Sequence, residues 1–461
     1  MNVKTKRVVI SDFSGGIKGD YAPRLLPLNY ATNAYNFNTI NGSLTDGVGL
    51  TLLKFLSGKT LTSIEPILST YYFKYFENGY KDKLLLYCLD KCVYCYEINS
   101  GELTKIENLV FENSPKGLSY RLQDKDIFIF SSQEGTFVFD GITATKVESV
   151  PIVEDICIHN ERLFAVQTGE KTRLYFSDDF NPFNFNQSNL EGGFIDLVDE
   201  RGGINKLVSN LGYLYLFRTH GISRLSSYYA QENFSVSHVF SCVGNIYPKS
   251  VTPCESGILF LAGDGIYMIS GYSVKKVLSN LDDFFIGVDN SDSKGMFFKG
   301  CFYLKCKLKI NGKQENALVV YRLKDDFGYI AKNLNVKDFC AIMGEDFSAP
   351  AIIAGNGKEV YTFCQSSSVC GVPLTKVWET PFTDLGVIGR DKILKKIEVY
   401  TNSQVKIIVL TEKSKKVFLL KPHNNYAVEN VSVRGNEFKF IIESCTVNCE
   451  ITKPMLTFSY V

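Results

Sequence analysis

A pattern of alternating apolar and polar residues recurs along the chain. Each copy has an apolar strand, a turn of two to four residues that contains or ends in glycine, and a second apolar strand. Apolar side chains at every second position give a strand one buried face, and glycine supplies the positive φ that tight hairpin turns need. The pattern therefore predicts β-hairpins, most clearly at residues 126–141, 212–227, 257–271 and 350–364.

The turn glycines of these hairpins are spaced in near multiples of one step. Gly221 follows Gly135 by 86 residues, and Gly265 follows Gly221 by 44. Gly357 follows Gly265 by 92 residues. Less regular hairpins lie within the two long intervals, at residues 162–178 with Gly169 and at residues 301–323 with Gly312. A further hairpin precedes the series, at residues 83–98. The mean step is near 44 residues, with single steps from 34 to 52.

A step of roughly 40–50 residues, with room for one small antiparallel sheet, is typical of a β-propeller blade. The sequence therefore predicts an all-β fold whose main part, residues 58–372, is a divergent propeller of six or seven blades. A β-sandwich is the alternative, because its hairpins also recur, although they need not keep a constant step.

Two regions lie outside the repeat. Residues 1–57 contain glycines, prolines and the strong turn signal Asn41-Gly42, so we expect an extended N-terminal arm followed by a hairpin. Residues 373–461 alternate apolar and polar positions over several short runs, which predicts a C-terminal antiparallel sheet or sandwich. Its strands are expected at 393–401, 404–412, 415–422, 436–444 and 455–461.

The composition supports strands over helices. The chain has 34 Phe and 26 Tyr but only 14 Ala, and aromatic residues favour pleated surfaces whereas Ala favours helices. Fifty basic and 49 acidic residues give a formal charge of +1, so the net charge provides no general attraction to nucleic acid or to an anionic membrane. No apolar run reaches 18 residues, and we expect neither a membrane span nor a secretory signal.

The 13 cysteines in a chain without such a signal predict reduced thiols. Cys88, Cys92 and Cys95 are close enough in sequence to suggest a zinc site, but they fall on two predicted strands where Cys92 and Cys95 face opposite sides. We interpret them as structural cysteines and expect no cofactor. Two further pairs, Cys364 with Cys370 and Cys445 with Cys449, show no complete ligand set.

The sequence contains no motif of a known catalytic machinery. The four histidines, at 159, 220, 238 and 423, have no metal-ligand spacing, and no nucleophile elbow, phosphate-binding loop or dinucleotide fingerprint is present. Carboxylates that could serve a glycosidase are Asp178, Asp179, Asp264, Asp282 and Asp283, and the oxygens of Asp178, Asp179 and Asn181 could contribute to a calcium site. Neither pattern is complete, and we expect a protein that is not an enzyme.

Three stretches resemble a family of tailed-bacteriophage virion proteins, the tail nozzle or tail tubular protein B family. The first is a Phe-x-Gly-Gly-Ile phrase followed by Leu-Pro, by an Ala/Asn-rich stretch and by a glycine turn; it comprises Phe13, Gly15, Gly16 and Ile17, then Leu26-Pro27, then Ala31 to Asn36, then Gly42 to Gly47. The second is residues 157–185, with a His-x-x-Arg-Leu-Phe segment and an Asn-Pro turn. The third is residues 377–401, where a Trp-containing strand leads to a Lys-Lys strand.

This resemblance implies a non-enzymatic structural component of the virion, in the tail nozzle or the head-tail connection, made in the bacterial cytoplasm. It implies a homo-oligomeric, sixfold ring around the DNA exit path, with portal, adaptor or tail proteins as partners and with DNA passing without specific binding. The candidate assembly contacts are Phe13, Gly15, Gly16, Ile17, Leu26 and Pro27. The alternatives are a receptor-binding propeller that recognises a cell-surface glycan, and a glycoside hydrolase or lyase on the same fold.

Overall fold

The computed structural model describes residues 3–19, 26–77, 79–188, 192–228, 231–241 and 244–460. Within these residues the fold is all-β and propeller-like. Six four-stranded antiparallel sheets follow one another along the chain, and a seventh, larger sheet completes the series. We number them sheets 1 to 7.

Each of the first six sheets takes four strands that are consecutive in sequence. Sheet 1 contains β8 (Ile67–Phe73), β9 (Lys83–Cys88), β10 (Cys92–Glu97) and β11 (Leu103–Val110). Sheet 2 contains β12 (Lys116–Leu122), β13 (Lys125–Ser132), β14 (Gly135–Phe139) and β15 (Ala144–Val147). Sheet 3 contains β16 (Val153–His159), β17 (Arg162–Gln167), β18 (Arg173–Phe176) and β19 (Gly193–Asp196).

The next three sheets repeat this arrangement. Sheet 4 contains β20 (Ile204–Asn210), β21 (Tyr213–Arg218), β22 (Gly221–Ser226) and β23 (Ser235–Ser241). Sheet 5 contains β24 (Thr252–Cys254), β25 (Gly257–Ala262), β26 (Gly265–Ser270) and β27 (Ser273–Val277). Sheet 6 contains β28 (Lys294–Phe298), β29 (Cys301–Ile310), β30 (Lys313–Arg322) and β31 (Phe327–Ala331).

Sheet 7 combines the two ends of this series. It contains β32 (Val336–Met343), β33 (Ser348–Ala354), β34 (Val360–Cys364), β7 (Gly49–Leu52), β35 (Ser368–Val369) and β36 (Val372–Pro373). The strand β7 comes from before sheet 1 and pairs antiparallel with β34, with Leu52 opposite Tyr361. A strand from the N-terminal side therefore closes the last sheet, although the sequence predicted that the propeller would begin only at residue 58.

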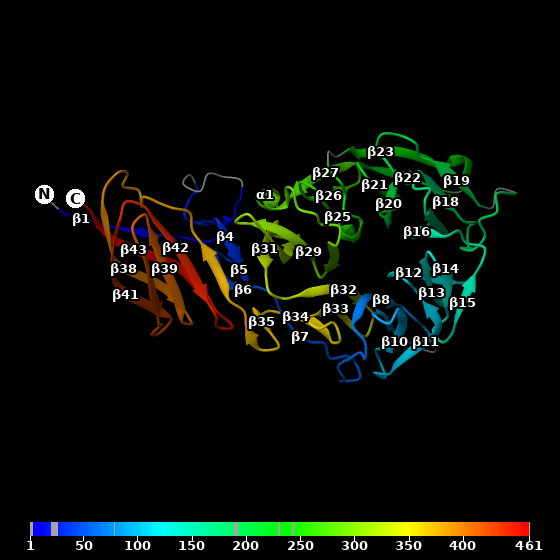
Figure 1. Cartoon of the computed structure of the whole chain (residues 1–461), viewed down its shortest axis with the longest axis horizontal. Helices are drawn as coiled ribbons and strands as arrows, with labels where there is room; N and C mark the ends of the chain where they lie inside the picture. Colours follow the sequence, from blue (N-terminus) through cyan, green and yellow to red (C-terminus); the bar gives the residue numbers. More distant parts are fainter. Residues whose placement is uncertain are drawn as a thin grey trace.

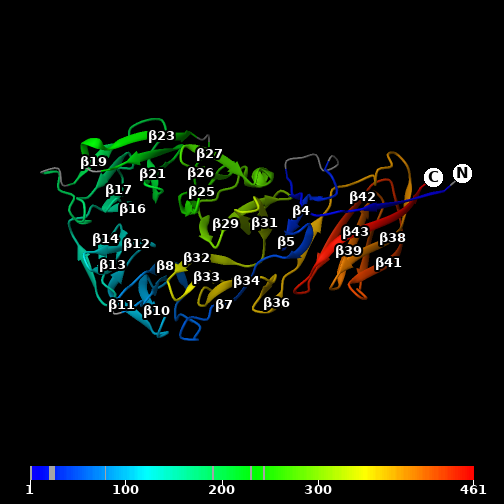
Figure 2. The same cartoon turned by 180° about the vertical axis from the view of Figure 1, so that it is seen from behind.

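The first strands of the sheets form a closed ring of contacts (Figure 1). Strand β8 contacts β12, β12 contacts β16, and β16 contacts β20. The short 3-10 turn η4 (Pro248–Ser250) links β20 to β28, β28 contacts β32, and β32 returns to β8. Figure 2 shows the same sheets from behind, again around a common centre. Radial packing of this kind covers the sheet edges and faces without a single central core.

Each of the seven predicted hairpins forms the second and third strands of one sheet. These strands are the most apolar of each sheet because neighbouring sheets cover both of their faces; all six residues of β9 and of β25 are buried. The turn at Gly265 shows why glycine is needed there. Its φ is +144°, and a Cβ would lie 2.3 Å from Asp282 Oδ1.

The C-terminal region adds two antiparallel sheets beside the ring. One contains β41 (Tyr426–Gly435), β38 (Lys392–Thr401), β43 (Ile451–Tyr460), β6 (Ser43–Asp46), β5 (Phe37–Ile40) and, on β43, β1 (Lys4–Val9). The other contains β4 (Asn33–Tyr35), β37 (Lys376–Glu379), β42 (Phe438–Ser444), β39 (Val405–Thr411) and β40 (Lys415–Leu420). The five predicted strands match β38, β39, β40, β42 and β43, while β41 was missed.

The first 57 residues, predicted to form an arm and a hairpin, pair in their described part with strands from the other end of the chain. The hairpin at Asn41-Gly42 forms as predicted, with φ of 49° and 76° at its two turn residues. Its strands, however, extend the C-terminal sheet, and β1 and β4 pair with β43 and β37. Short extended segments cannot bury their apolar side chains alone, so they complete sheets formed by later residues.

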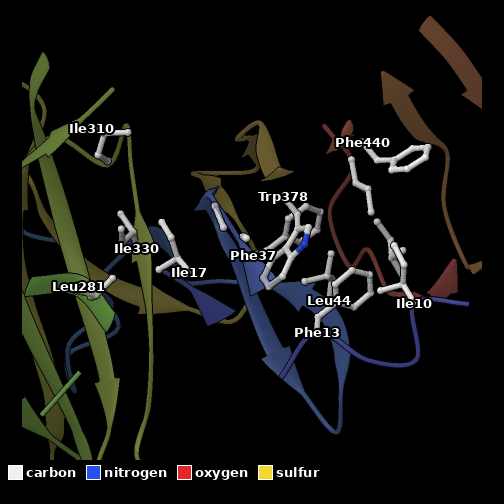
Figure 3. Close-up of a cluster of buried hydrophobic side chains, with 14 of the residues drawn as sticks. Ile10, Phe13, Ile17, Phe37, Leu44, Leu281, Ile310, Ile330, Trp378 and Phe440 are labelled. Atoms are coloured by element: carbon white, nitrogen blue, oxygen red, sulfur yellow. The ribbon is translucent and has the colours of Figure 1, made fainter. Parts of the chain in front are cut away.

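One continuous core joins the ring to the C-terminal sheets (Figure 3). Ile17 lies beside Ile330 and Leu281 on the ring side, and Phe13 lies against Trp378 on the other side. An ion pair reinforces this joint. Lys376 Nζ lies 2.9 Å from Asp46 Oδ1, and both side chains are almost completely buried. Asp46 also accepts hydrogen bonds from the backbone N–H groups of Ser367, Asn448 and Cys449.

The remaining elements are short. They are β2 (Gly16–Ile17) paired with β3 (Tyr30–Ala31), the 3-10 turns η3 (Gln231–Asn233) and η5 (Ser279–Leu281), and the single-turn helix α1 (Asp282–Phe285). Among the described residues no helix has the length and apolar character to cross a membrane.

Candidate functional site

The predicted assembly residues lie at the joint between the ring and the C-terminal sheets. Phe13, Ile17 and Leu26 are buried in the chain itself, and Gly16 is buried beside them. A Cβ at Gly15 would lie 2.7 Å from the backbone oxygen of Asn29, so this glycine permits a close approach of two segments. Pro27 is exposed. The side chains that carry the phrase thus pack within one chain, and their role in assembly stays a prediction.

Of the acidic residues that could serve calcium binding or sugar hydrolysis, Asp179, Asp264 and Asp282 lie within 4 Å of basic side chains. Lys276 Nζ lies 2.9 Å from Asp264 Oδ2 and 3.0 Å from Asp282 Oδ2. Burial opposes ionisation of Asp264, but hydrogen bonds from Lys276 and Tyr267, together with the positive charge of Lys276, lower the pKa of this carboxyl below its ordinary value. These two carboxylates therefore share one ammonium group in the turn region of sheet 5.

The loop after β18 brings Asp178 and Asp179 side by side. Burial and the neighbouring Asp179 carboxylate raise the pKa of Asp178, while Asp179 lies 3.7 Å from the buried guanidinium of Arg162. Asn181 forms a bridge with Asp178 across the turn. In the part of the chain that the structure describes, no group of three His, Cys, Asp or Glu side chains is arranged to hold a metal ion.

His159, Cys88 and Cys95 serve packing in the structure. His159 is buried and its Nδ1 lies 2.8 Å from Ser209 Oγ, and burial lowers its pKa to about 4. Cys88 and Cys95 lie in different apolar clusters, and burial raises the pKa of each thiol to about 11. A high pKa keeps a thiol protonated and unreactive near neutral pH.

The structure points instead to the inner strands of the ring, which the sequence did not indicate. Each of sheets 1 to 6 has four antiparallel strands, so its fourth strand ends at the side of the ring where the next sheet begins. The first strands consequently run the same way. We call a group of polar and charged residues at or just before the starts of these strands the strand-start set; it comprises Ser69, Lys116, Asp155, Lys206, Lys249, Lys294 and Asp338.

Asp338, a member of the strand-start set, joins three sheets. This buried carboxylate on β32 accepts hydrogen bonds from the backbone N–H and the hydroxyl of Thr70 on β8, at 2.8 and 2.9 Å. Its other oxygen lies 2.5 Å from the ammonium of Lys294 on β28. One side chain therefore ties sheet 7 to sheets 6 and 1, where the ring closes.

Asp155 makes the equivalent connection on the opposite side of the ring. It is 1% exposed and accepts a hydrogen bond of 2.7 Å from the backbone N–H of Leu207 and one of 3.0 Å from Lys206 Nζ. Burial opposes the charge on Lys206, but the Asp155 carboxylate outweighs it and raises the pKa of this lysine. Sheets 3 and 4 are joined in this way.

A cleft opens between sheets 6, 7 and 1. Its volume is about 1010 Å³, and both polar and apolar residues line it. Lys305 on β29 lies in this wall and donates a hydrogen bond of 2.8 Å to the backbone oxygen of Lys337. The cleft also contains several asparagines, namely Asn290, Asn316, Asn333 and Asn335.

A weak sequence signal for the strand-start set does exist. In four of the first strands the pairing register shifts between an apolar residue and a polar residue two positions later. These pairs are Ile67/Ser69, Val153/Asp155, Ile204/Lys206 and Val336/Asp338. A β-bulge at this place turns the polar side chain toward the centre of the ring. This pattern of one apolar residue and one polar residue two positions later is too short to be recognised in the sequence unless the first strands of the sheets are aligned with one another.

No protein-family model matches this chain, and no curated protein matches it. Solved structures with a similar arrangement include the computationally designed Ika8 protein, at 8% identity and a TM-score of 0.41 over 66% of this chain and 98% of that one. BBS1N in its complex with ARL6DN has 9% identity and a TM-score of 0.43, over 65% of this chain and 92% of that one.

PorZ of Porphyromonas gingivalis, described as an essential bacterial surface component of the type-IX secretion system, has 11% identity and a TM-score of 0.33. The match covers 65% of this chain and 52% of PorZ. At such identities and TM-scores these likenesses carry no argument about function.

Proposed function

We propose that this chain is a non-enzymatic structural component of a bacteriophage virion. In this proposal it belongs to the tail nozzle or the head-tail connection and assembles into a sixfold ring around the DNA exit path. Its partners are portal, adaptor or other tail proteins, and DNA passes without specific binding. The proposal rests on the resemblance of three sequence stretches to the tail nozzle family.

One structural observation supports it above the others. Phe13, from the first stretch, packs against Trp378, from the third, with 5.1 Å between the ring centroids. The strands next to these residues also pair, since Ala34 on β4 lies opposite Trp378 on β37. Two stretches with the same family resemblance, far apart in sequence, thus form one joint, as expected if both are parts of a single structural element.

We further propose that the ring is a seven-bladed propeller closed by β7, beside a C-terminal sandwich. Sheets 1 to 7 would be the blades, and strand β7 would supply the outer part of the last blade. A blade that combines strands from the two ends of the ring resists opening of the ring, because the ring can open only if β7 separates from β34. Such a rigid unit suits a scaffold whose subunits keep fixed positions in a virion.

The test has two parts. Purified protein is examined by size-exclusion chromatography with light scattering and by negative-stain electron microscopy, and rings of defined stoichiometry are expected. Virions are then purified from cells in which the chain is made during phage infection, and an antibody against the chain is used to locate it by electron microscopy. Labelling at the tail or the head-tail connection supports the proposal. Absence of the chain from purified virions would contradict it.

A second function, binding of a host cell-surface glycan, is favoured by the cleft between sheets 6, 7 and 1. Amide side chains such as Asn333 and Asn335 line it and are exposed, and they can donate to and accept from sugar hydroxyls. A glycan array with the purified protein tests this function. Binding that is lost in the Asn333→Ala and Asn335→Ala variants supports it, and an array without hits argues against it.

A further inference from the structure

Arg224 on β22 carries a buried guanidinium without a charged partner. Only 5% of this residue is exposed, and its Nε is enclosed without a hydrogen-bond partner. Among the described residues, no carboxylate oxygen lies within 4.0 Å of the guanidinium. A buried charge that is neither paired nor hydrogen-bonded is unfavourable. The missing partner therefore points to one that another molecule supplies.

The other two buried arginines of the described residues do have partners. Arg218 lies 2.8 Å from Asp199 Oδ1, and Arg162 donates a hydrogen bond of 2.7 Å to the backbone oxygen of Ser177. Buried guanidinium groups of this chain are thus normally satisfied within the chain, and Arg224 differs from them.

Two tyrosine rings cover the faces of the Arg224 guanidinium. Its Cζ lies 3.8 Å from the ring centroid of Tyr213 on β21 and 3.5 Å from that of Tyr272, in the turn between β26 and β27. The rings come from neighbouring sheets, since β21 and β27 lie side by side in Figures 1 and 2. At these distances two rings fit only on opposite faces of the planar group. Only its edge remains for hydrogen bonds, and the N–H groups at that edge form a planar fork that matches a carboxylate.

The surface beside this stack is rich in tyrosine. Tyr272 is 62% exposed and Tyr228 is 47% exposed. The Tyr228 hydroxyl donates a hydrogen bond of 3.0 Å to the backbone oxygen of Gly212, the residue before Tyr213. Tyrosine and arginine are among the residues that most often dominate the binding energy of protein interfaces. We call this surface the tyrosine patch; it comprises Tyr213, Arg224, Tyr228 and Tyr272.

We propose that the tyrosine patch binds an acidic peptide segment of another protein. An Asp or Glu carboxylate of that segment accepts hydrogen bonds from the edge of the Arg224 guanidinium. Apolar side chains next to this carboxylate pack against the exposed rings of Tyr228 and Tyr272. Charge complementarity determines the choice of partner, because the patch supplies a cation that lacks its anion. This inference does not depend on a virion role.

A peptide array probed with the purified full-length protein tests the proposal. The array carries random octapeptides and a matched set in which phosphoserine replaces every Asp and Glu. Bound peptides should be enriched in Asp or Glu beside Leu, Ile or Phe. Absence of binding, binding without this enrichment, or a preference for the phosphoserine set would overturn the proposal.

Variants then assign the site, with fluorescence anisotropy of the array peptide that binds the unmodified protein most strongly. Arg224→Lys keeps the charge but loses the planar fork, so binding should weaken by about tenfold. Tyr272→Ala should also weaken binding, and because Tyr272 is exposed this variant keeps its fold even where a change at Arg224 does not. Tyr272→Phe retains the ring and should bind as the unmodified protein does.

Tyr400→Ala is the matched control, because Tyr400 is 48% exposed and lies on β38 in a C-terminal sheet. It should bind the peptide with unchanged affinity. Full binding by both Arg224→Lys and Tyr272→Ala, or an equal loss in Tyr400→Ala, would contradict the assignment.

Discussion

The ring of Phe13 packs edge-on against the indole of Trp378, with centroids 5.1 Å apart and an interplanar angle of 78°. Both side chains are almost completely buried, and they belong to segments that lie at opposite ends of the sequence. The contact forms part of the core that joins the ring to the C-terminal sheets (Figure 3). Its loss should therefore affect the joint directly.

Replacing Phe13 with alanine should lower the free energy of unfolding by about 3–5 kcal/mol, since the substitution leaves a cavity in a closely packed core. Trp378 is the only tryptophan, so its fluorescence reports on this joint alone. The emission should shift to longer wavelength as water reaches the indole. Urea unfolding followed by fluorescence measures both effects. Phe180→Ala is the control, because Phe180 is 69% exposed; an equal loss of stability in both variants would contradict the prediction.

Asp338→Asn should destabilise the protein by about 3–5 kcal/mol, because it leaves the ammonium of Lys294 without its buried partner. Thermal and urea unfolding measure this loss. Asp346→Asn, at an exposed carboxylate in the turn after β32, should change stability by less than about 0.5 kcal/mol. Combining Asp338→Asn with Lys294→Met should recover part of the loss, since the unpaired charge is then absent. No difference between the single and the double variant would argue against this explanation.

Stability should fall between pH 6.5 and pH 4 because of His159. Burial lowers its pKa from 6.5 to about 4, so the unfolded chain binds a proton in this range before the folded one does. The contribution of His159 is fully present above pH 6.5 and is lost as the pH falls through 4, with a total of about 3 kcal/mol.

The measurement compares urea unfolding of the unmodified protein and His159→Gln at pH 7, 5 and 4. The unmodified protein should lose about 3 kcal/mol more than the variant over this range. His220→Gln, at an exposed histidine in a hairpin turn, should keep the full pH dependence. Identical pH profiles for the unmodified protein and His159→Gln would exclude this role.

Closure of sheet 7 by β7 can be tested at Leu50, which is completely buried between β34 and its neighbours. Leu50→Ala should cost about 2–5 kcal/mol. Hydrogen exchange measured by mass spectrometry should speed up at Val360–Cys364, because β34 loses its partner strand more often. Thr51→Ala, which changes an exposed side chain of the same strand, should leave that exchange unchanged. Unaltered protection of β34 in Leu50→Ala would show that β7 does not close the sheet.

Local patterns were sufficient to predict the hairpins. The alternation in residues 257–271 and the glycine at 265 determine two paired strands whatever the rest of the chain does, because the side-chain period and the turn geometry are local. The same reasoning located most strands of the C-terminal region. It missed β41, in which polar residues such as Glu429 and Asn430 interrupt the apolar positions.

The partners of the N-terminal segments and the members of the strand-start set could not be obtained in this way. Pairing of β7 with β34, or of β1 with β43, brings together residues from distant parts of the chain, and several partners would satisfy the same alternation. The sequence by itself determined a strand-rich chain of repeated hairpins. Only the tertiary structure decided which strands close the ring and that Asp155 and Asp338 each join neighbouring sheets, because burial of edges and charges is a property of the whole assembly of sheets.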